Sequence, residues 1–164
     1  MTIKLILGPM FAGKTTAIFD TITDGCDVIT HTLDTRYQDK GICSHDGKYL
    51  SCTMLSSLND YLIPSNVNKI IVDEIQFFPD VKNFILKHID LEIVFVGIIS
   101  DSDGKMFPTI SQVITFADQI EIVSGNCACG GVTRFTRRRC ESTDLFLPGG
   151  IDSYEPLCTS CFYK

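Results

Sequence analysis

The chain has 164 residues, a length typical of one ordinary domain with a small appendage, and its 45% hydrophobic residues are enough for a packed core. A net charge of −6 argues against a surface built mainly to hold nucleic acid or an anionic membrane. The longest apolar stretch, residues 93–99, is too short to cross a bilayer, and the N-terminal apolar run does not resemble a signal peptide. We therefore expect a cytoplasmic protein without nucleic-acid or membrane partners.

The first motif follows the apolar run 3–7, which is predicted to be a strand. It fits the phosphate-binding pattern GxxxxGK[ST] and consists of Gly8, Pro9, Met10, Phe11, Ala12, Gly13, Lys14 and Thr15. The glycines allow backbone N–H groups to surround a polyphosphate, Lys14 can reach the β and γ phosphates, and the Thr15 hydroxyl can hold Mg²⁺. A helix is predicted from Lys14 to about Thr23, and its positive end faces the anion. This pattern predicts that the chain binds a nucleoside triphosphate.

The second predicted strand, residues 26–30, leads into a polar segment, and in open α/β sheets ligands bind at such strand ends. There Asp34 could hold a water of the Mg²⁺ shell, and Arg36 could neutralise charge on a transferring phosphoryl group. The alternative is an exposed Asp/Arg pair in a polar loop. Residues 37–48 are predicted to form a loop or weak hairpin, and residues 55–62 a short helix.

A second strong motif lies at residues 69–74, where an apolar strand ends in two acids. In phosphate-loop proteins, an acid at this position completes the Mg²⁺ site and the next lies beside the γ phosphate. Because side chains alternate along a strand, we expect separate tasks for the two carboxylates. We assign Asp73 to the water shell of the metal, and Glu74 to the acceptor hydroxyl as general base or orienting group. The alternative is a capped strand end with solvated acids.

The remaining pattern alternates between helix and strand. A helix is predicted at residues 81–88, a buried strand at 91–99, a loop at 100–108 and a last strand at 119–124. Strands separated by helical stretches predict a doubly wound parallel α/β sheet of the P-loop, RecA-like kind. We place the end of this ATP-binding domain at residue 124.

Residues 125–164 contain two close cysteine pairs, Cys127 with Cys129 and Cys158 with Cys161. Such pairs can close a tetrahedral zinc site and hold together a segment too short for its own core. An ATP-using chain is expected in a reducing compartment, which favours metal ligands over disulfides. Free thiols are the alternative. We expect a small zinc-ribbon-like domain here, and a packing role for most of the unpaired cysteines.

A basic run interrupts this acidic chain in the same segment. It comprises Arg134, Arg137, Arg138 and Arg139. Most such runs are solvated strand or loop faces. The alternative is contact with phosphates or with a neighbouring subunit.

Taken together, these motifs resemble the small, zinc-bearing thymidine kinases of cells and large DNA viruses. The resemblance covers essentially the whole chain, in family order. Its matching segments are residues 8–15, 34–37, 45–46 and 73–80, and the ending with Gly149, Gly150, Tyr154, Cys158 and Cys161. The 73–80 run and this ending are more specific than the phosphate loop alone.

The resemblance implies transfer of the ATP γ phosphate to the 5′ hydroxyl of thymidine, with Glu74 as the base. Within the motif of Asp73, we group Gln76 with the nucleotide-binding residues. Residues that match positions around the nucleoside are Met10, Phe77, Phe107, Thr136 and Tyr154. The segment 147–154, with Gly149, Gly150 and Ile151, matches a loop that folds over the nucleoside. The family resemblance also suggests a homotetramer.

The chain departs from the family pattern in three places. The usual Leu-Asp-Gly-x-Phe-x-x-x-Pro-Phe stretch is replaced by residues 99–107, so one ring-stacking phenylalanine has no evident counterpart. The first cysteine of the usual CxxC falls at Asn126, which leaves Cys127 as a substitute ligand. The helix after the phosphate loop is shorter by about two turns, some 11 Å.

Two other functions fit parts of the pattern. One is a minimal RecA-like ATPase, in which Glu74 would activate water instead of a sugar hydroxyl. The other is a zinc-ribbon binding module that uses ATP as a switch. A motor normally needs further motifs and a longer chain, and a nucleic-acid module needs a broader basic surface with aromatic residues. We therefore expect a kinase.

Overall fold

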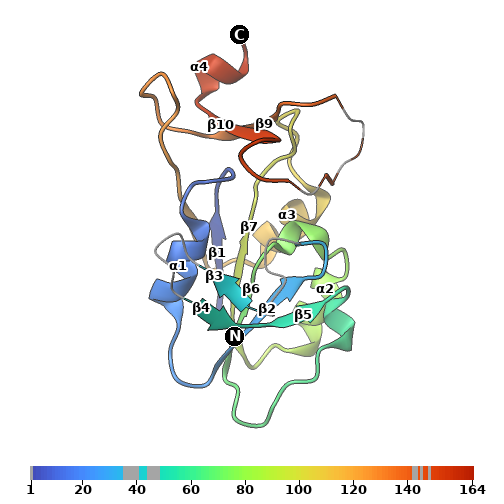
Figure 1. Ribbon diagram of the computed structural model, residues 1–164. Coiled ribbons are helices and arrows are strands. Elements are labelled where there is room, and N and C mark those ends of the chain that lie inside the picture. Colours follow the sequence, from blue (N-terminus) through green and yellow to red (C-terminus); the bar gives the residue numbers. More distant parts are fainter. Residues whose placement is uncertain (1, 35–40, 44–48, 142–143, 145, 148) are drawn as a thin grey trace.

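The computed structural model describes residues 2–34, 41–43, 49–141, 144, 146–147 and 149–164. Its centre is a six-stranded sheet in the order β5-β2-β6-β7-β1-β8, in which every neighbouring pair is parallel (Figure 1). The strands are β1 (Thr2–Leu7), β2 (Cys26–His31), β5 (Thr53–Leu55), β6 (Lys69–Val72), β7 (Glu92–Gly97) and β8 (Gln119–Ile122). All six therefore point their carboxyl ends toward one edge of the sheet.

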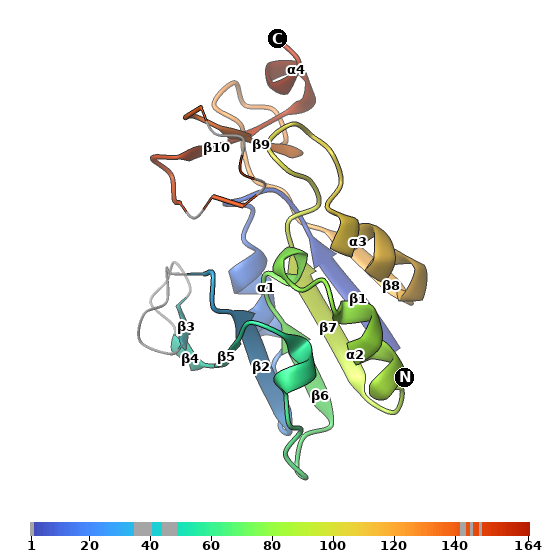
Figure 2. The ribbon, with the colours of Figure 1, turned by 90° about the vertical axis from the view of Figure 1, so that its right-hand side faces the viewer.

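Helices cover both faces of this sheet (Figure 2). Helix α1 (Lys14–Thr21) lies on one face, and helices α2 (Val81–Lys87) and α3 (Pro108–Val113) lie on the other. Because strand side chains alternate, each face has its own core: Val94 packs on the α1 side, whereas Phe95 packs with α2 and α3. The prediction of a doubly wound parallel α/β sheet is confirmed.

Several predicted elements differ from those in the structure. Strand β5 was not predicted, and the helix expected at residues 55–62 is a single 3₁₀ turn, η1 (Leu58–Asp60), capped by the Ser57 hydroxyl. Helix α3 was also not predicted, although Pro108 at its first turn is a known start signal. Most of the loop or weak hairpin expected at residues 37–48 lies outside the described residues. Strand β3 (Gly41–Cys43), inside this range, pairs antiparallel with β4 (Tyr49–Ser51), which follows it.

The C-terminal part forms a second layer above the carboxyl ends of the sheet (Figures 1 and 2). It contains the antiparallel pair β9 (Phe135–Arg138) and β10 (Tyr154–Leu157), followed by the short helix α4 (Thr159–Phe162). We call residues 125–164 the cysteine region and residues 2–124 the sheet region. Within the described residues, no helix has the length and apolar character needed to span a membrane.

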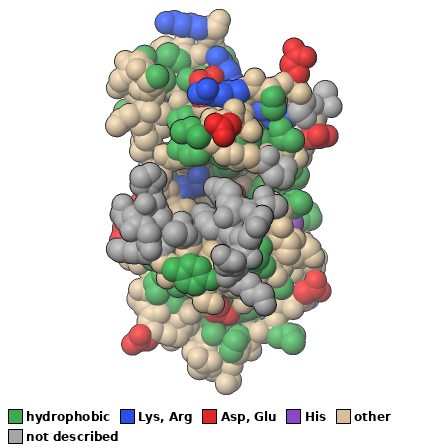
Figure 3. Space-filling view, viewed as in Figure 1, with side chains coloured by type: hydrophobic (Ala, Val, Ile, Leu, Met, Phe, Trp, Pro, Cys, Tyr) green, Lys and Arg blue, Asp and Glu red, His purple; other side chains and the backbone are tan. Residues whose placement is uncertain are grey.

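The arginine run stabilises the cysteine region itself. Lysine and arginine side chains gather on the surface of this region (Figure 3). Arg137 donates to the carbonyl groups of Cys161, at 3.0 Å, and Phe162, while Arg138 donates to the Asp144 carbonyl at 2.8 Å. Arg139 lies 3.6 Å from a Glu155 carboxylate oxygen. Arg137, Arg138 and Arg139 thus tie strand β9 and the residue after it to neighbouring segments while remaining partly exposed to solvent, as expected for a strand face.

Candidate active site

The phosphate-binding loop begins where β1 ends. The Gly8 N–H donates to the Gly97 carbonyl at 3.2 Å, and a Cβ atom at Gly8 would lie 2.4 Å from the Val123 carbonyl oxygen, so only glycine fits there. The loop then turns through two left-handed residues, Phe11 with φ +62° and Gly13 with φ +83°. A non-glycine residue in this conformation costs on the order of 1–3 kcal/mol and is typical of functional loops.

Lys14 starts helix α1 and folds back over the loop. Its side chain is buried, and its Nζ donates to the Pro9 carbonyl oxygen at 2.8 Å. The ammonium group therefore lies inside the curve of the loop. Thr15 follows in the first turn of α1, half-buried, with the positive end of the helix beside it. This arrangement is suited to an anionic group and its counter-ion.

Two carboxylates follow the end of β6, but the alternation of side chains along a strand does not set their directions. Strand β6 ends at Val72, so Asp73 and Glu74 are outside it, and Glu74 has a left-handed backbone with φ +55°. The Glu74 N–H donates to Asp73 Oδ1 at 2.9 Å. Both side chains are buried, with 2% and 6% exposure, so the alternative of solvated acids is wrong. This turn, rather than the strand pleat, sets the directions of the two side chains.

Gln76 holds the Glu74 carboxylate. The Gln76 Nε2 donates to Glu74 Oε2, and the Gln76 Oε1 accepts from the Ile98 N–H at 3.1 Å. A Cβ atom at Gly97 would lie 2.7 Å from Gln76 Oε1, so the glycine at the end of β7 makes room for this contact. Gln76, predicted as a nucleotide-binding residue, thus contacts Glu74 directly, which its position in the sequence does not indicate.

Asp34 approaches the same edge from β2. It is 5% exposed, and its N–H donates to the His31 carbonyl at 2.9 Å. Burial raises the pKa of the Cys52 thiol to about 11, and the charges of Asp73 and Asp34 add to the rise. Both carboxylates are thus within electrostatic reach of one thiol, as expected from neighbouring parallel strands. Arg36, His45 and Asp46 lie outside the described residues.

The cysteine region contacts the phosphate-binding loop directly. The Met10 N–H donates to the Thr136 hydroxyl of β9 at 2.9 Å, and Thr136 is buried. Gly125 also lies against the loop, because a Cβ atom there would be 3.2 Å from the Phe11 carbonyl oxygen. The loop is therefore shared between the two regions.

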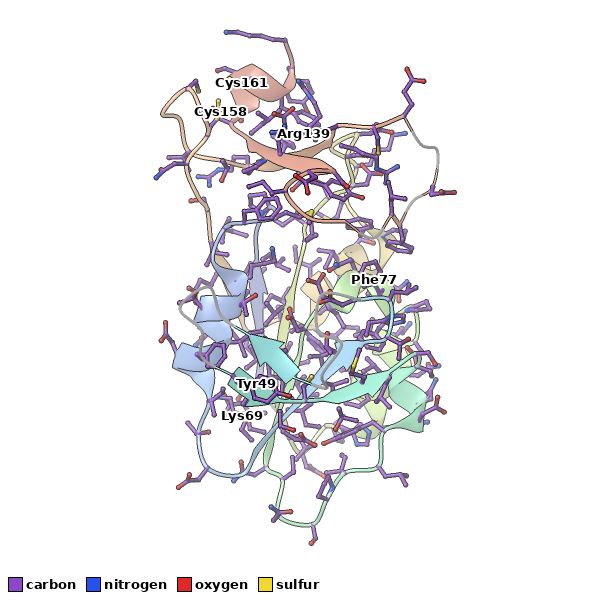
Figure 4. The ribbon with its side chains drawn as sticks, viewed as in Figure 1. Tyr49, Lys69, Phe77, Arg139, Cys158 and Cys161 are labelled. Carbon is purple, nitrogen blue, oxygen red and sulfur yellow. The ribbon has the colours of Figure 1, made fainter. Side chains whose placement is uncertain are left out.

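Aromatic rings form a second contact between the regions. Phe77 belongs to the 3₁₀ turn η2 (Ile75–Phe77), and the buried Phe107 precedes α3. The ring of Phe146 stacks on Phe107 at a centroid distance of 5.7 Å and an angle of 15°, and meets Phe77 edge-on at 4.8 Å. In Figure 4, Phe77 lies near the junction of the two regions. Phe146 was not among the predicted site residues; the available signal was that it is the single aromatic residue in the segment 139–153.

The loop between β9 and β10 is tied down near its end. The buried Tyr154 donates from its hydroxyl to the Leu147 carbonyl at 2.6 Å. Gly149 packs closely, since a Cβ atom there would be 2.7 Å from Ser153, and the Gly150 carbonyl accepts from the Ser153 and Tyr154 N–H groups at 3.0 Å. Ile151 is 65% exposed. Residues 149–153 of the predicted covering segment therefore form a compact turn leading into β10.

The four paired cysteines converge into one cluster. The Sγ atoms of Cys127, Cys129, Cys158 and Cys161 all lie within 4.8 Å of one another, and Cys158 and Cys161 are labelled in Figure 4. A tetrahedral zinc with 2.3 Å bonds places its sulfur ligands about 3.8 Å apart. Hydrogen bonds from the backbone N–H groups of Cys129 and Cys158 lower the pKa of Cys127 to about 6, which favours the thiolate that binds metal. The residues fit a zinc ion.

A tight turn makes the CxC spacing compatible with this cluster. The Cys127 N–H donates to the Gly131 carbonyl, and the Gly130 N–H donates to the Cys127 carbonyl, both at 2.8 Å. Gly130 has φ +85°, and a Cβ atom at Gly131 would lie 3.1–3.4 Å from the side chains of Cys158 and Cys129. Glycines at both positions thus allow Cys127 to replace the ligand absent at Asn126.

These features define the chain as a P-loop α/β protein with carboxylates at neighbouring strand ends and a cysteine-clamped region over the loop. The family model described as thymidine kinase matches residues 1–162. A thymidine kinase of Amsacta moorei entomopoxvirus is 32% identical, covering 99% of this chain and 98% of its own. A thymidine kinase of Oryza sativa is 33% identical, covering 95% and 64%, and one of Bacteroides thetaiotaomicron is 27% identical, covering 99% and 87%. The chain belongs to the thymidine kinase family.

Proposed function

We propose that this protein phosphorylates thymidine, transferring the γ-phosphoryl group of ATP to the 5′ hydroxyl. The observation that carries the proposal is the buried Glu74 carboxylate, held by Gln76 at the strand edge that also bears the phosphate-binding loop. Membership of the thymidine kinase family supports the choice of acceptor. A carboxylate fixed there can receive or orient a hydroxyl group next to a bound triphosphate.

The triphosphate and its metal ion would bind at the loop and the strand ends. Backbone N–H groups of residues 8–15 and the Lys14 ammonium group would surround the phosphates. The Thr15 hydroxyl would hold Mg²⁺, with the buried carboxylates of Asp34 and Asp73 binding its water molecules. When bound, Mg²⁺ neutralises charge on the phosphates. We assign to Arg36 the task of neutralising the negative charge that develops on the transferring phosphoryl group.

Glu74 would act on the acceptor. The nucleoside 5′ oxygen forms a bond to the γ phosphorus as the bond from that phosphorus to the bridging oxygen of ADP breaks, and the hydroxyl proton passes to Glu74. Because the transition state is loose, orientation of the hydroxyl contributes more than its full deprotonation. Gln76, bonded to both Glu74 and Ile98, is a positioning residue for this step.

The nucleoside would bind where the two regions meet. We place the base against Met10, Phe77 and Phe107. Thr136 would form the floor of this pocket, and Tyr154 would lie near the deoxyribose and the base. The turn containing Gly149, Gly150 and Ile151 would cover it. Apolar rings exclude water from such a site, while a few polar groups set the orientation. The Met10 contact with Thr136 would then couple the ATP loop to the nucleoside site.

We also propose a domain division, a role for zinc, a cellular location and an oligomeric state for the chain. We propose an ATP-binding domain at residues 1–124 and a zinc-binding domain at residues 125–164, with Zn²⁺ in a structural role because all four ligands are cysteines. We further propose a cytoplasmic homotetramer that binds neither nucleic acid nor membranes.

The test measures ADP formation by the purified protein with Mg²⁺ and ATP, with and without thymidine. We expect turnover that depends on thymidine and yields thymidine 5′-monophosphate. Equal turnover with and without thymidine would favour the RecA-like ATPase. ATP binding with no transfer in either case would favour the ATP-switched binding module.

A further inference from the structure

Thr30 carries a fully buried hydroxyl group near the carboxyl end of β2. The residue is 0% exposed, and its Oγ1 atom has no hydrogen-bond partner among the residues that the structure describes. Buried hydroxyl groups in folded proteins almost always have a partner, because an unpartnered one has lost its bonds to water without replacement. A water molecule or an ion that arrives with a ligand is a common explanation of such an exception.

The Thr30 side chain faces helix α1. Along β2, Val28 packs in the core on the α1 face of the sheet, and Ile29 packs in the core on the opposite face. Since strand side chains alternate, Thr30 faces α1 again. Helix α1 begins with Lys14 and Thr15 of the phosphate-binding loop. Thr30 therefore lies on the face of the sheet that carries the proposed triphosphate-binding groups.

The neighbours of Thr30 in the sheet are an apolar residue on one side and an acidic residue on the other. Met54 of β5 is its register partner and packs in the core on the α1 face. On the side of β6, the Asp73 N–H donates to the Ile29 carbonyl at 2.8 Å, which places Asp73 next to the peptide bond between Ile29 and Thr30. Burial and then the charge of Asp73 raise the pKa of the Cys52 thiol, which packs in the same core as Met54. The Asp73 carboxylate is therefore within electrostatic reach of the core that Thr30 faces.

The turn after β2 brings a second carboxylate to this place. The Asp34 N–H donates to the His31 carbonyl at 2.9 Å, and the Asp34 side chain is buried. Two buried carboxylates and one buried hydroxyl group thus gather at the ends of β2 and β6. A protein-bound Mg²⁺ usually keeps several water molecules, and oxygen atoms of this kind are suited to hold them.

We propose that Thr30 is a positioning residue of the metal–nucleotide site, and that its hydroxyl group binds a water molecule shared with Asp73 when Mg²⁺ and ATP are bound. This inference rests on the nucleotide binding of the proposed function. A hydroxyl group can donate a hydrogen bond to a water molecule or accept one from it, whereas a carboxylate only accepts. Thr30 therefore fixes the orientation of this water molecule relative to the Asp73 carboxylate.

The test compares Thr30→Val with Thr30→Ser in the full-length protein, by melting temperature and by calorimetry with a non-hydrolysable ATP analogue. Valine has nearly the same shape as threonine but no hydroxyl group, so Thr30→Val should raise the melting temperature of the nucleotide-free protein by about 2–4 °C. The same variant should bind the analogue about tenfold more weakly with Mg²⁺ present, and like the wild type when EDTA removes the metal. Thr30→Ser keeps the hydroxyl group and should bind like the wild type in both conditions.

The matched control is Thr53→Val, the same change on the neighbouring strand β5. Thr53 is the register partner of Ile29 and faces the opposite side of the sheet, where Leu55 packs. This variant should bind the analogue like the wild type, with and without Mg²⁺.

Three results in Thr30→Val would overturn the proposal. They are an unchanged Kd in the presence of Mg²⁺, an equal loss of affinity with and without Mg²⁺, which indicates a packing role, and a lower melting temperature, which indicates a partner in the free protein. A wild-type protein that does not bind the analogue would overturn the proposed function together with this inference, so the two failures are distinguishable.

Discussion

The sheet region and the cysteine region are held together by different forces. The sheet region buries an apolar core on each face of its parallel sheet, with fully buried residues such as Phe95 and Val96. In the part of the chain that the structure describes, the cysteine region has a cluster of three buried residues, Cys127, Leu157 and Cys158. A segment of about 40 residues rarely folds on apolar burial alone. The cysteine cluster is therefore the expected source of its stability, through a bound metal.

The candidate site draws on both regions, but for different tasks. The phosphate-binding loop and the carboxylates lie in the sheet region, although the loop also contacts the cysteine region through Thr136, whereas Phe146 and Tyr154 lie wholly in the cysteine region. Loss of the metal should therefore weaken nucleoside binding more than ATP binding.

The largest effect is expected from removing metal ligands with the double substitution Cys158→Ser and Cys161→Ser. Because binding of a structural zinc contributes about 10–16 kcal/mol in small metal-dependent domains, the cysteine region should unfold. Thymidine-dependent turnover should fall to background while ATP binding is weakened less, as measured by a product assay and by calorimetry with an ATP analogue. Cys140→Ser, at an exposed cysteine outside the cluster, is the control and should keep full activity. Retained turnover in a metal-free double variant would contradict the assigned role of the cysteine region.

A smaller effect, confined to the sheet region, is expected from Gln76→Leu. The substitution removes the hydrogen bond from Gln76 to the Glu74 carboxylate and leaves the half-buried Ile98 N–H without its acceptor, which costs about 1 kcal/mol of folding stability. We expect kcat to fall about tenfold or more through lost orientation of Glu74, with thymidine KM little changed. Steady-state kinetics and urea unfolding measure both effects.

The same substitution at Gln112, an exposed residue on α3, serves as the control for Gln76→Leu. It should leave kcat and stability unchanged. If Gln76→Leu alters stability but not kcat, then Gln76 is a packing residue and not a positioning residue.

The smallest effect concerns the pH dependence of stability in the sheet region. His31 is buried, its Nδ1 accepts from the Leu33 N–H at 2.9 Å, and its ring contacts Phe77 and Phe78. Burial lowers the pKa of His31 below its usual 6.5. The unfolded chain then binds more protons than the folded one below pH 6.5, so the free energy of unfolding should decrease as pH falls from 6.5 toward the folded pKa.

Urea unfolding at several pH values measures this slope. His31→Gln should flatten it, and the flattening should persist in a His88→Gln background, because burial also lowers the pKa of His88. An unchanged slope in His31→Gln would show that His31 is not protonated differently in the folded and unfolded states.

Local motifs explain which parts of the site could be predicted from the sequence. The phosphate-binding loop and the acids after β6 are each defined within a few residues, and the alternation of helices and strands defines the parallel sheet. The contact between Gln76 and Ile98, and the stack of Phe146 on Phe107, join residues far apart in the chain. Short elements such as β5 and η1 carry too few residues for a periodic signal, so tertiary packing decides them.

The cysteine cluster shows a different limit. CxC is an uncommon spacing for metal ligands, and sequence alone does not reveal that the glycine turn at residues 130–131 allows Cys127 and Cys129 to face one point. The direction of Glu74 is a similar case. The sequence pattern extends the strand through residue 74, whereas β6 ends at Val72 and Glu74 has a left-handed backbone. The pattern therefore does not predict the direction of the Glu74 side chain.

The central claim is that Glu74 acts on the nucleoside hydroxyl beside the bound triphosphate. The most direct measurement is the rate of thymidine 5′-monophosphate formation in a single turnover by the wild type and by Glu74→Gln, with binding of an ATP analogue measured in parallel. Glu121→Gln, on the exposed strand β8, is the matched control. We predict unchanged ATP binding and a transfer rate at least about 10²-fold lower in Glu74→Gln alone. Transfer at the wild-type rate in Glu74→Gln would contradict the account.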